Sequence, residues 1–242
     1  MVCLMVCGVA LDAAADAHEG APVRMTRMSE TIYRADCRAC PRLAKFLDKT
    51  KYQYPEYFCK PVPPFGASDA ALVIVGLAPG MHGANRTGRP FTGDHAGYLL
   101  YATLKTFGFA SGTFSPDGGD DLVLNDCRIS NAVKCLPPDN KPGTDEIKRC
   151  NPYLAADLKQ PGARVVVALG LIAHGALLTA IGLKKSHCKF AHAAEHVLPV
   201  TGGASLTMVD SYHCSRYNTN TGRLTPAMFE AVFARARALV DA

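Results

Sequence analysis

The segment ALVIVGLAPGMHGANRTGRPFTGDHAG spans residues 71–97 and contains both a strand and a binding loop. A short β-branched run ends at Gly76, and a loop rich in glycine, proline and arginine follows before a new apolar segment begins near residue 95. The run predicts a buried strand, and the polar residues after it predict a loop that binds a ligand. Because open α/β sheets bind ligands beyond the carboxyl ends of their strands, we expect the active site at this loop.

Strands and helices are predicted to alternate along the rest of the chain. Further strands are expected at residues 127–134, 164–169 and 206–209, and helices at residues 95–107, 144–159, 172–181 and 226–240. Asp94 is placed to cap the first of these helices, because its carboxylate can accept backbone N–H groups. The alternation predicts an α/β fold in which helices cover both faces of a mostly parallel sheet.

The composition predicts one domain. The 242 residues carry a formal net charge of +5 without a break in composition, and we expect a single domain at residues 29–242. Residues 1–28 lack the basic flank of a signal peptide and the length of a membrane span, and we interpret them as a disordered leader or an over-long gene start. We expect a cytoplasmic monomer without a membrane segment. The basic excess permits a polyanionic partner without proving one.

The cysteines suggest a metal or cluster site. The chain has 10 of them, which is many for a cytosolic enzyme. Cys37 and Cys40 form a C-x-x-C pair, whereas Cys135 and Cys150 lie far downstream. Four thiolates can hold zinc or an iron–sulfur cluster. The spacing alone leaves two alternatives, a four-cysteine site or a redox pair with two buried core cysteines. No role is assigned to Cys59, Cys127, Cys188 or Cys214.

The glycine loop is not a nucleoside triphosphate site. Residues 83–88 have the glycine spacing of a P-loop, but that motif continues with lysine and then serine or threonine, and here Arg89 and Pro90 follow.

Asn131, inside a predicted central strand, is either a satisfied core amide or a group that reads the edge of a base. Phe91 is either a hydrophobic anchor or a stacking platform for a planar ligand.

Two longer motifs resemble a known family. Residues 76–94, GLAPGMHGANRTGRPFTGD, and residues 213–222, HCSRYNTNTG, closely resemble the signature motifs of the family 5 uracil-DNA glycosylases, and the likeness runs from about Cys37 onward. It implies a three-layer α/β/α fold around a central four-stranded, mostly parallel sheet. It also implies DNA containing uracil as the partner, and a structural 4Fe-4S cluster whose ligands would be Cys37, Cys40, Cys135 and Cys150.

The resemblance implies a monofunctional DNA glycosylase of base excision repair, which flips a nucleotide from the duplex and hydrolyses the bond between base and sugar. Phe91 would stack on the flipped base, and Asn131 would read its polar edge. His213, as a hydrogen-bond donor or as a cation, would stabilise the negative charge that develops on the departing base. The backbone around Ala78 and Gly80 would assist. Hypoxanthine and etheno-cytosine are expected as further substrates.

The group that activates the water is left open. Leu77 and Ala78 stand where other families of the superfamily carry an acidic or amide side chain, and Leu77 argues against the narrower specificity of family 4. Asn85 can orient a water but cannot deprotonate it. Asp94 could act as the base or could only cap its helix. A non-catalytic iron–sulfur protein that binds abasic or damaged DNA is the alternative function.

DNA contacts are expected from side chains near both motifs. Arg216 and Tyr217 are candidates for a wedge that fills the gap left by the flipped nucleotide. The candidates for phosphate contacts are Arg86, Arg89, Arg216 and Arg223.

Overall fold

The computed structural model describes residues 33–199 and 205–242. The interpretation of residues 1–28 lies outside the described residues. Within those ranges, no helix combines the length and the apolar character that a bilayer crossing requires.

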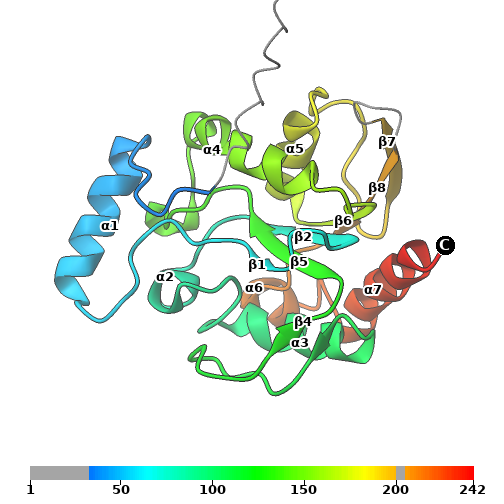
Figure 1. Ribbon diagram of the computed structural model, residues 1–242, viewed down its shortest axis with the longest axis horizontal. Helices are drawn as coiled ribbons and strands as arrows, with labels where there is room; N and C mark the ends of the chain where they lie inside the picture. Colours follow the sequence, from blue (N-terminus) through cyan, green and yellow to red (C-terminus); the bar gives the residue numbers. More distant parts are fainter. Residues whose placement is uncertain (1–32, 200–204) are drawn as a thin grey trace, which may run out of the picture. The chain divides into compact units, whose positions relative to one another are not determined.

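A six-stranded sheet forms the centre of the fold, in the order β1-β5-β2-β6-β8-β7 (Figure 1). The four inner strands are parallel to one another and correspond to the four predicted strands: β5 (Cys127–Asn131), β2 (Leu72–Gly76), β6 (Val165–Leu169) and β8 (Ser205–Ser211). Two antiparallel strands, β1 (Phe65–Gly66) and β7 (Glu195–Pro199), extend the sheet at its edges. The predicted four-stranded parallel sheet is therefore confirmed as the inner part of a wider sheet.

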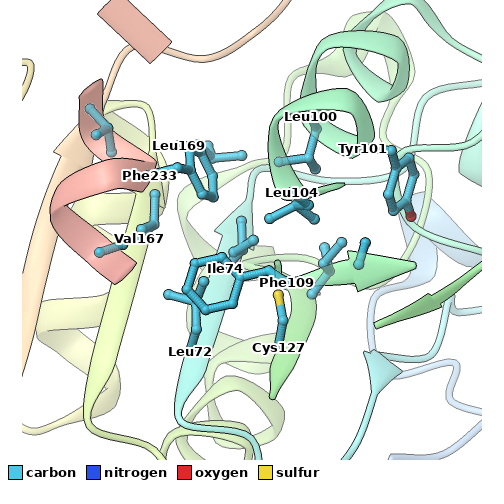
Figure 2. Packing of buried hydrophobic residues seen from close by; sticks show 14 of the residues in the cluster. Leu72, Ile74, Leu100, Tyr101, Leu104, Phe109, Cys127, Val167, Leu169 and Phe233 are labelled. Atoms are coloured by element: carbon cyan, nitrogen blue, oxygen red, sulfur yellow. The ribbon is translucent and has the colours of Figure 1, made fainter. Parts of the chain in front are cut away.

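Two helices cover one face of the sheet. α3 (His95–Thr106) and α7 (Pro226–Val240) pack their apolar side chains against Leu72 and Ile74 of β2 and Val167 of β6 (Figure 2). Asp94 caps α3 as predicted, since its side chain accepts a hydrogen bond from the backbone N–H of Gly97. The capped helix begins directly after the glycine loop and holds the end of that loop against the sheet.

Two other helices cover the opposite face and complete the three layers. α4 (Thr144–Leu158) and α5 (Leu171–Ala180) contact Val73 and Val75 of β2 and Val166 of β6. Successive residues of a strand point to opposite faces, so strands covered on both sides are apolar at every position. All five residues of β2 and of β6 are buried, which explains their uninterrupted apolar sequences.

The remaining elements lie outside these layers of sheet and covering helices. They are α1 (Pro41–Gln53), α2 (Ala84–Thr87), β3 (Ala110–Ser111), β4 (Val123–Leu124), the 3-10 helix η1 (Pro138–Asn140) and α6 (Arg216–Asn220). The structure differs from prediction in two details near the site. The glycine loop contains the single turn α2, and β5 ends at Asn131 instead of continuing to residue 134. Asn131 is the residue paired with Gly76, the last residue of β2, and the backbone N–H groups of Ala132 and Val133 still donate to the carbonyls of Gly76 and Leu77.

Candidate active site

A cavity of about 630 Å³ opens at the carboxyl ends of the parallel strands. Its wall is built from the glycine loop after β2, from the end of β5 and from the segment after β8. Four side chains that the sequence singled out lie in this wall: Phe91, Asp94, Asn131 and His213. The backbone of the loop contributes Ala78 and Gly80. The structure therefore brings the base-binding candidates and two of the catalytic candidates to one place.

Phe91 is held in an unusual backbone conformation. Its φ angle is +56°, in the left-handed region that a bulky residue rarely occupies, and its side chain is buried. Two contacts fix this turn. The Tyr101 hydroxyl donates a hydrogen bond of 2.6 Å to the carbonyl of Pro90, and Gly97 lies so close that a Cβ there would be 1.9 Å from the Phe91 oxygen. Such a conformation costs about 1–3 kcal/mol and persists where the surroundings impose it.

Phe91 and Asn131 meet above the end of β2. A Cβ on Gly76 would be 2.5 Å from the Asn131 amide oxygen and 2.8 Å from Cζ of Phe91. The missing side chain of Gly76 therefore lets an aromatic ring and an amide approach each other at the floor of the cavity. Such a pair can hold a planar ring by stacking while hydrogen bonding to its edge.

Replacing Gly76 with alanine is expected to lower kcat/KM for base release by about 10²-fold, because a shift of about 1 Å at a reacting centre can cost that much. The added methyl group must displace Phe91, Asn131 or both. Steady-state kinetics would measure the loss, with circular dichroism to verify folding. Gly119→Ala is the matched control, since a Cβ at Gly119 meets nothing within 4 Å. Wild-type kinetics for Gly76→Ala would show that these two side chains do not hold the base.

Asp94 uses its two oxygens differently. Oδ1 accepts the capping hydrogen bond from the Gly97 N–H at 3.3 Å. Oδ2 faces the glycine loop, where a Cβ would be 2.7 Å away at Gly83 and 3.5 Å away at Gly80. Burial raises the pKa of this carboxyl above its usual value, against the lowering effect of backbone hydrogen bonds. Helix capping and a role in the cavity are therefore compatible.

His213 is neutral at physiological pH. Burial lowers the pKa of its imidazole to about 4, and its ring stacks on Phe91 with 5.9 Å between the ring centroids and 24° between the planes. The backbone at His213 is held in place by α6, because the Asn218 side chain donates a hydrogen bond of 2.8 Å to the His213 carbonyl. Of the two states expected from the sequence, the structure favours a neutral hydrogen-bond donor over a cation.

Comparison with known proteins agrees with this geometry. The family model described as the uracil DNA glycosylase superfamily matches residues 63–237. The chain belongs to this superfamily. It is 46% identical over 211 residues to a type-5 uracil-DNA glycosylase of Thermus thermophilus, covering 84% of this chain and 93% of the relative. Type-5 enzymes of Mycobacterium bovis and Pyrobaculum aerophilum are 39% and 37% identical, each over 84% of this chain and over 78% and 88% of the relative. The resemblance seen in the two motifs is confirmed.

Asn85 does not line the cavity that contains Phe91 and His213. Its side chain is fully buried, with Nδ2 lying 3.4 Å from both Cys59 Sγ and the carbonyl of Met81. Its Oδ1 has no hydrogen-bond partner among the described residues. The expected catalytic role required contact with a water in the cavity. The observed position instead gives Asn85 a structural role, because its side chain joins α2 to Cys59 and to the Met81 carbonyl.

Two of the four candidate arginines hold the glycine loop in place. Arg89 forms a double hydrogen bond with Asp120, at 2.6 Å to each oxygen, and only 14% of its side chain is exposed. Arg86 pairs with Asp117 at 2.9 Å. The expectation that Arg89 contacts phosphate is therefore corrected, since its charge is already neutralised by a buried carboxylate. No motif in the sequence indicates this pairing, although the acidic loop at residues 117–121 supplies both partners.

The other DNA-contact candidates lie on the surface. Arg216 lines the rim of the cavity, and Tyr217 beside it on α6 is 72% exposed. Arg223 is exposed with its guanidinium 4.7 Å from the Tyr212 ring centroid. These side chains remain accessible to a partner, Arg216 at the cavity itself and Tyr217 beside it on α6.

A second group of predicted residues converges away from the base cavity. Cys37, Cys40, Cys135 and Cys150 line one pocket formed by the chain before α1, the chain after β5 and helix α4. Burial raises the pKa of the Cys135 thiol to about 12, and the other three thiols add to this rise. The backbone N–H of Lys134 donates to Cys150 Sγ at 3.3 Å. Cysteines that line one pocket are a residue type that can hold an iron–sulfur cluster.

The remaining described cysteines do not join this group. Cys127 and Cys214 are buried in the hydrophobic core beside α3 and α7. Cys59 contacts Asn85, and Cys188 lies on the α5 side of the sheet. Cys127 and Cys214 therefore act as small apolar core residues.

Proposed function

We propose that this chain excises uracil from DNA by hydrolysing the N-glycosidic bond, as a monofunctional glycosylase of base excision repair. One observation carries the proposal: a single cavity contains an aromatic ring, an amide, a neutral imidazole and a carboxylate. These are Phe91, Asn131, His213 and Asp94. Removal of a base needs a group to hold it, a group to stabilise it as it leaves and a group to direct the water.

The base is bound between ring and amide in this proposal. Phe91 stacks on the face of the extruded base, and the Asn131 amide pairs with its hydrogen-bonding edge. Both side chains are positioned before the substrate arrives, Phe91 by its constrained turn and Asn131 by the end of β5. Such preorganisation reduces the entropy lost on binding.

His213 stabilises the leaving group. As the glycosidic bond breaks, negative charge grows on the base oxygen, and a neutral imidazole N–H can donate a hydrogen bond to it. The partly buried ring strengthens this interaction because less water competes with it. The base then leaves as an anion, and the sugar passes through an oxocarbenium-like state.

Asp94 activates the water. Its Oδ2, which faces the loop glycines, is free of the capping interaction and can accept a proton from a water in the cavity. The same negative charge stabilises the cationic sugar. This assignment gives the chain a carboxylate even though Leu77 and Ala78 occupy the positions where other families carry a polar group.

The DNA backbone is held at the rim. Arg216 and Arg223 contact phosphates, and Tyr217 enters the duplex where the extruded nucleotide was. Arg86 supports the loop through Asp117.

The four cysteines hold a structural 4Fe-4S cluster in this proposal. Cys37, Cys40, Cys135 and Cys150 would be its ligands, and the cluster would cross-link segments that are far apart in the sequence. Lys134, the residue before Cys135, also ties the chain after β5 to α4, since its buried ammonium group lies 3.0 Å from the carboxylate of Asp157 on that helix.

The substrate range is proposed to extend beyond uracil to hypoxanthine and etheno-cytosine. A cavity of about 630 Å³ has room for a purine as well as a pyrimidine, and Asn131 is the amide in its lining that lies beside Phe91. An amide both donates and accepts hydrogen bonds, so it can pair with several base edges. Action as a cytoplasmic monomer stays a prediction.

Base release from labelled duplexes tests this function. We expect release of uracil, and also of hypoxanthine and etheno-cytosine, but no release from an undamaged duplex of the same sequence. A binding assay on the same duplexes would accompany the turnover assay. Tight binding without any release would favour the alternative, a non-catalytic protein that recognises damaged DNA.

A further inference from the structure

A cluster of histidine and aspartate side chains lies outside the base cavity and outside the cysteine pocket. It consists of His174 on α5, His196 on β7 and Asp210 on β8, and these three elements are neighbours in the fold (Figure 1). His174 is 2% exposed and Asp210 is fully buried, whereas 16% of the His196 side chain is exposed. The activity proposed above uses none of these side chains.

The hydrogen bonds of His174 leave its Nδ1 atom without a donor to pair with when the imidazole is neutral. Nε2 of His174 lies 3.1 Å from the backbone carbonyl oxygen of Cys188. A carbonyl only accepts hydrogen bonds, so Nε2 must carry the proton. Nδ1 of a neutral His174 then presents a lone pair to Asp210 Oδ1, only 2.8 Å away. Two acceptors at this distance repel each other unless a proton or a metal cation lies between them.

The position of His196 favours a metal cation over a proton between these atoms. Nε2 of His196 lies 3.2 Å from Oδ2 of the same carboxylate, and one donor atom from each of the three residues lies within 4.8 Å of the others. Two imidazole nitrogens and a carboxylate oxygen form a common ligand set for zinc. Ligating histidines usually donate their other N–H to a carbonyl or carboxylate, as His174 does to Cys188. The partly exposed His196 provides a path for entry.

We propose that His174 Nδ1, His196 Nε2 and Asp210 form a binding site for a divalent transition-metal ion, with zinc as the preferred ion. The ion would join α5, the edge strand β7 and the end of β8. Asp210 precedes His213 by three positions on the same segment, so the ion would also anchor the chain that carries this histidine. The alternative explanation is an imidazolium of His174 paired with Asp210, which needs no metal.

Metal analysis of the full-length protein, with its iron content measured in the same sample, tests the proposal. After incubation with zinc and removal of free ions, we expect one zinc per chain. His196→Ala and Asp210→Asn should lose this zinc without a change in iron. The first residue is partly exposed on an edge strand, and the second replacement keeps the side-chain size, so both variants should fold. His187→Ala is the control, because His187 is exposed in the same region and should leave zinc binding intact.

Thermal unfolding gives a second measurement. Zinc at about 100 times its dissociation constant should raise the Tm of the unsubstituted protein by roughly 5–10 °C, and should leave the Tm of His196→Ala unchanged. Zinc retained equally by His196→Ala would place the ion elsewhere, for example on the cysteines, and would overturn the proposal. Absence of both bound zinc and a Tm shift would also overturn it, in favour of the imidazolium–carboxylate pair.

Discussion

His213→Ala is expected to slow base release by about 10²–10³-fold while leaving DNA binding nearly unchanged. That range is typical for the loss of one preorganised donor that stabilises developing negative charge. Single-turnover kinetics on a uracil duplex would measure the rate, and fluorescence anisotropy on an abasic duplex would measure binding. The two measurements separate the chemical step from recognition.

The geometry explains why the effect should fall on the chemical step. His213 lies at the cavity wall with its ring against Phe91, while the arginines proposed to hold the DNA backbone, Arg216 and Arg223, are exposed on the surface. With a pKa of about 4, the imidazole carries no charge at neutral pH and adds little to the attraction of phosphates. Its contribution grows only as the base becomes an anion, which is the condition for lowering the barrier.

A second substitution separates hydrogen bonding from packing at this position. His213→Asn keeps an N–H donor in a smaller side chain, and should retain more activity than His213→Ala. Equal rates for the two variants would indicate that the ring acts by supporting Phe91. Wild-type turnover in both would remove His213 from the mechanism.

The inner sheet could be predicted because its strands are covered on both faces. β2 and β6 contain uninterrupted apolar residues, so their pattern is distinct without any knowledge of their neighbours. The edge strands lack this signal. β1 has only two residues, and β7 contains a glutamate, a histidine and a proline with mixed exposure, so that its pairing with β8 depends on long-range contacts.

The candidate site was predictable to a similar degree. Parallel strands bring their carboxyl ends to one edge, which places Phe91, Asn131 and His213 together once the strands are assigned. The direction of a side chain within a loop cannot be inferred in this way. Asn85 and Arg89 belong to the same motif as Phe91, yet the Asn85 side chain contacts Cys59 and Arg89 is held by Asp120, 31 residues later.

Asp94→Asn is expected to lower the rate of base release by about 10²–10⁴-fold, the usual contribution of a general base. Asparagine caps a helix about as well as aspartate, so α3 should keep its stability and the variant should differ mainly in the lost carboxylate. Asp94→Ala would remove the cap as well, and should unfold more easily by about 1 kcal/mol. A fully active Asp94→Asn enzyme would show that Asp94 is only a helix cap.

The pH dependence of the rate provides an independent test of the same assignment. A general base works when ionised, so activity should fall as the pH decreases through the pKa of Asp94, which burial raises above that of an exposed aspartate. Burial lowers the pKa of His213 to about 4, so its own protonation contributes mainly at the acidic end of the profile, and the variant at Asp94 is what separates the two groups. The residual activity of Asp94→Asn should therefore lack this acidic decline. If the decline persists in the variant, another group must titrate, and the water must be activated elsewhere in the cavity.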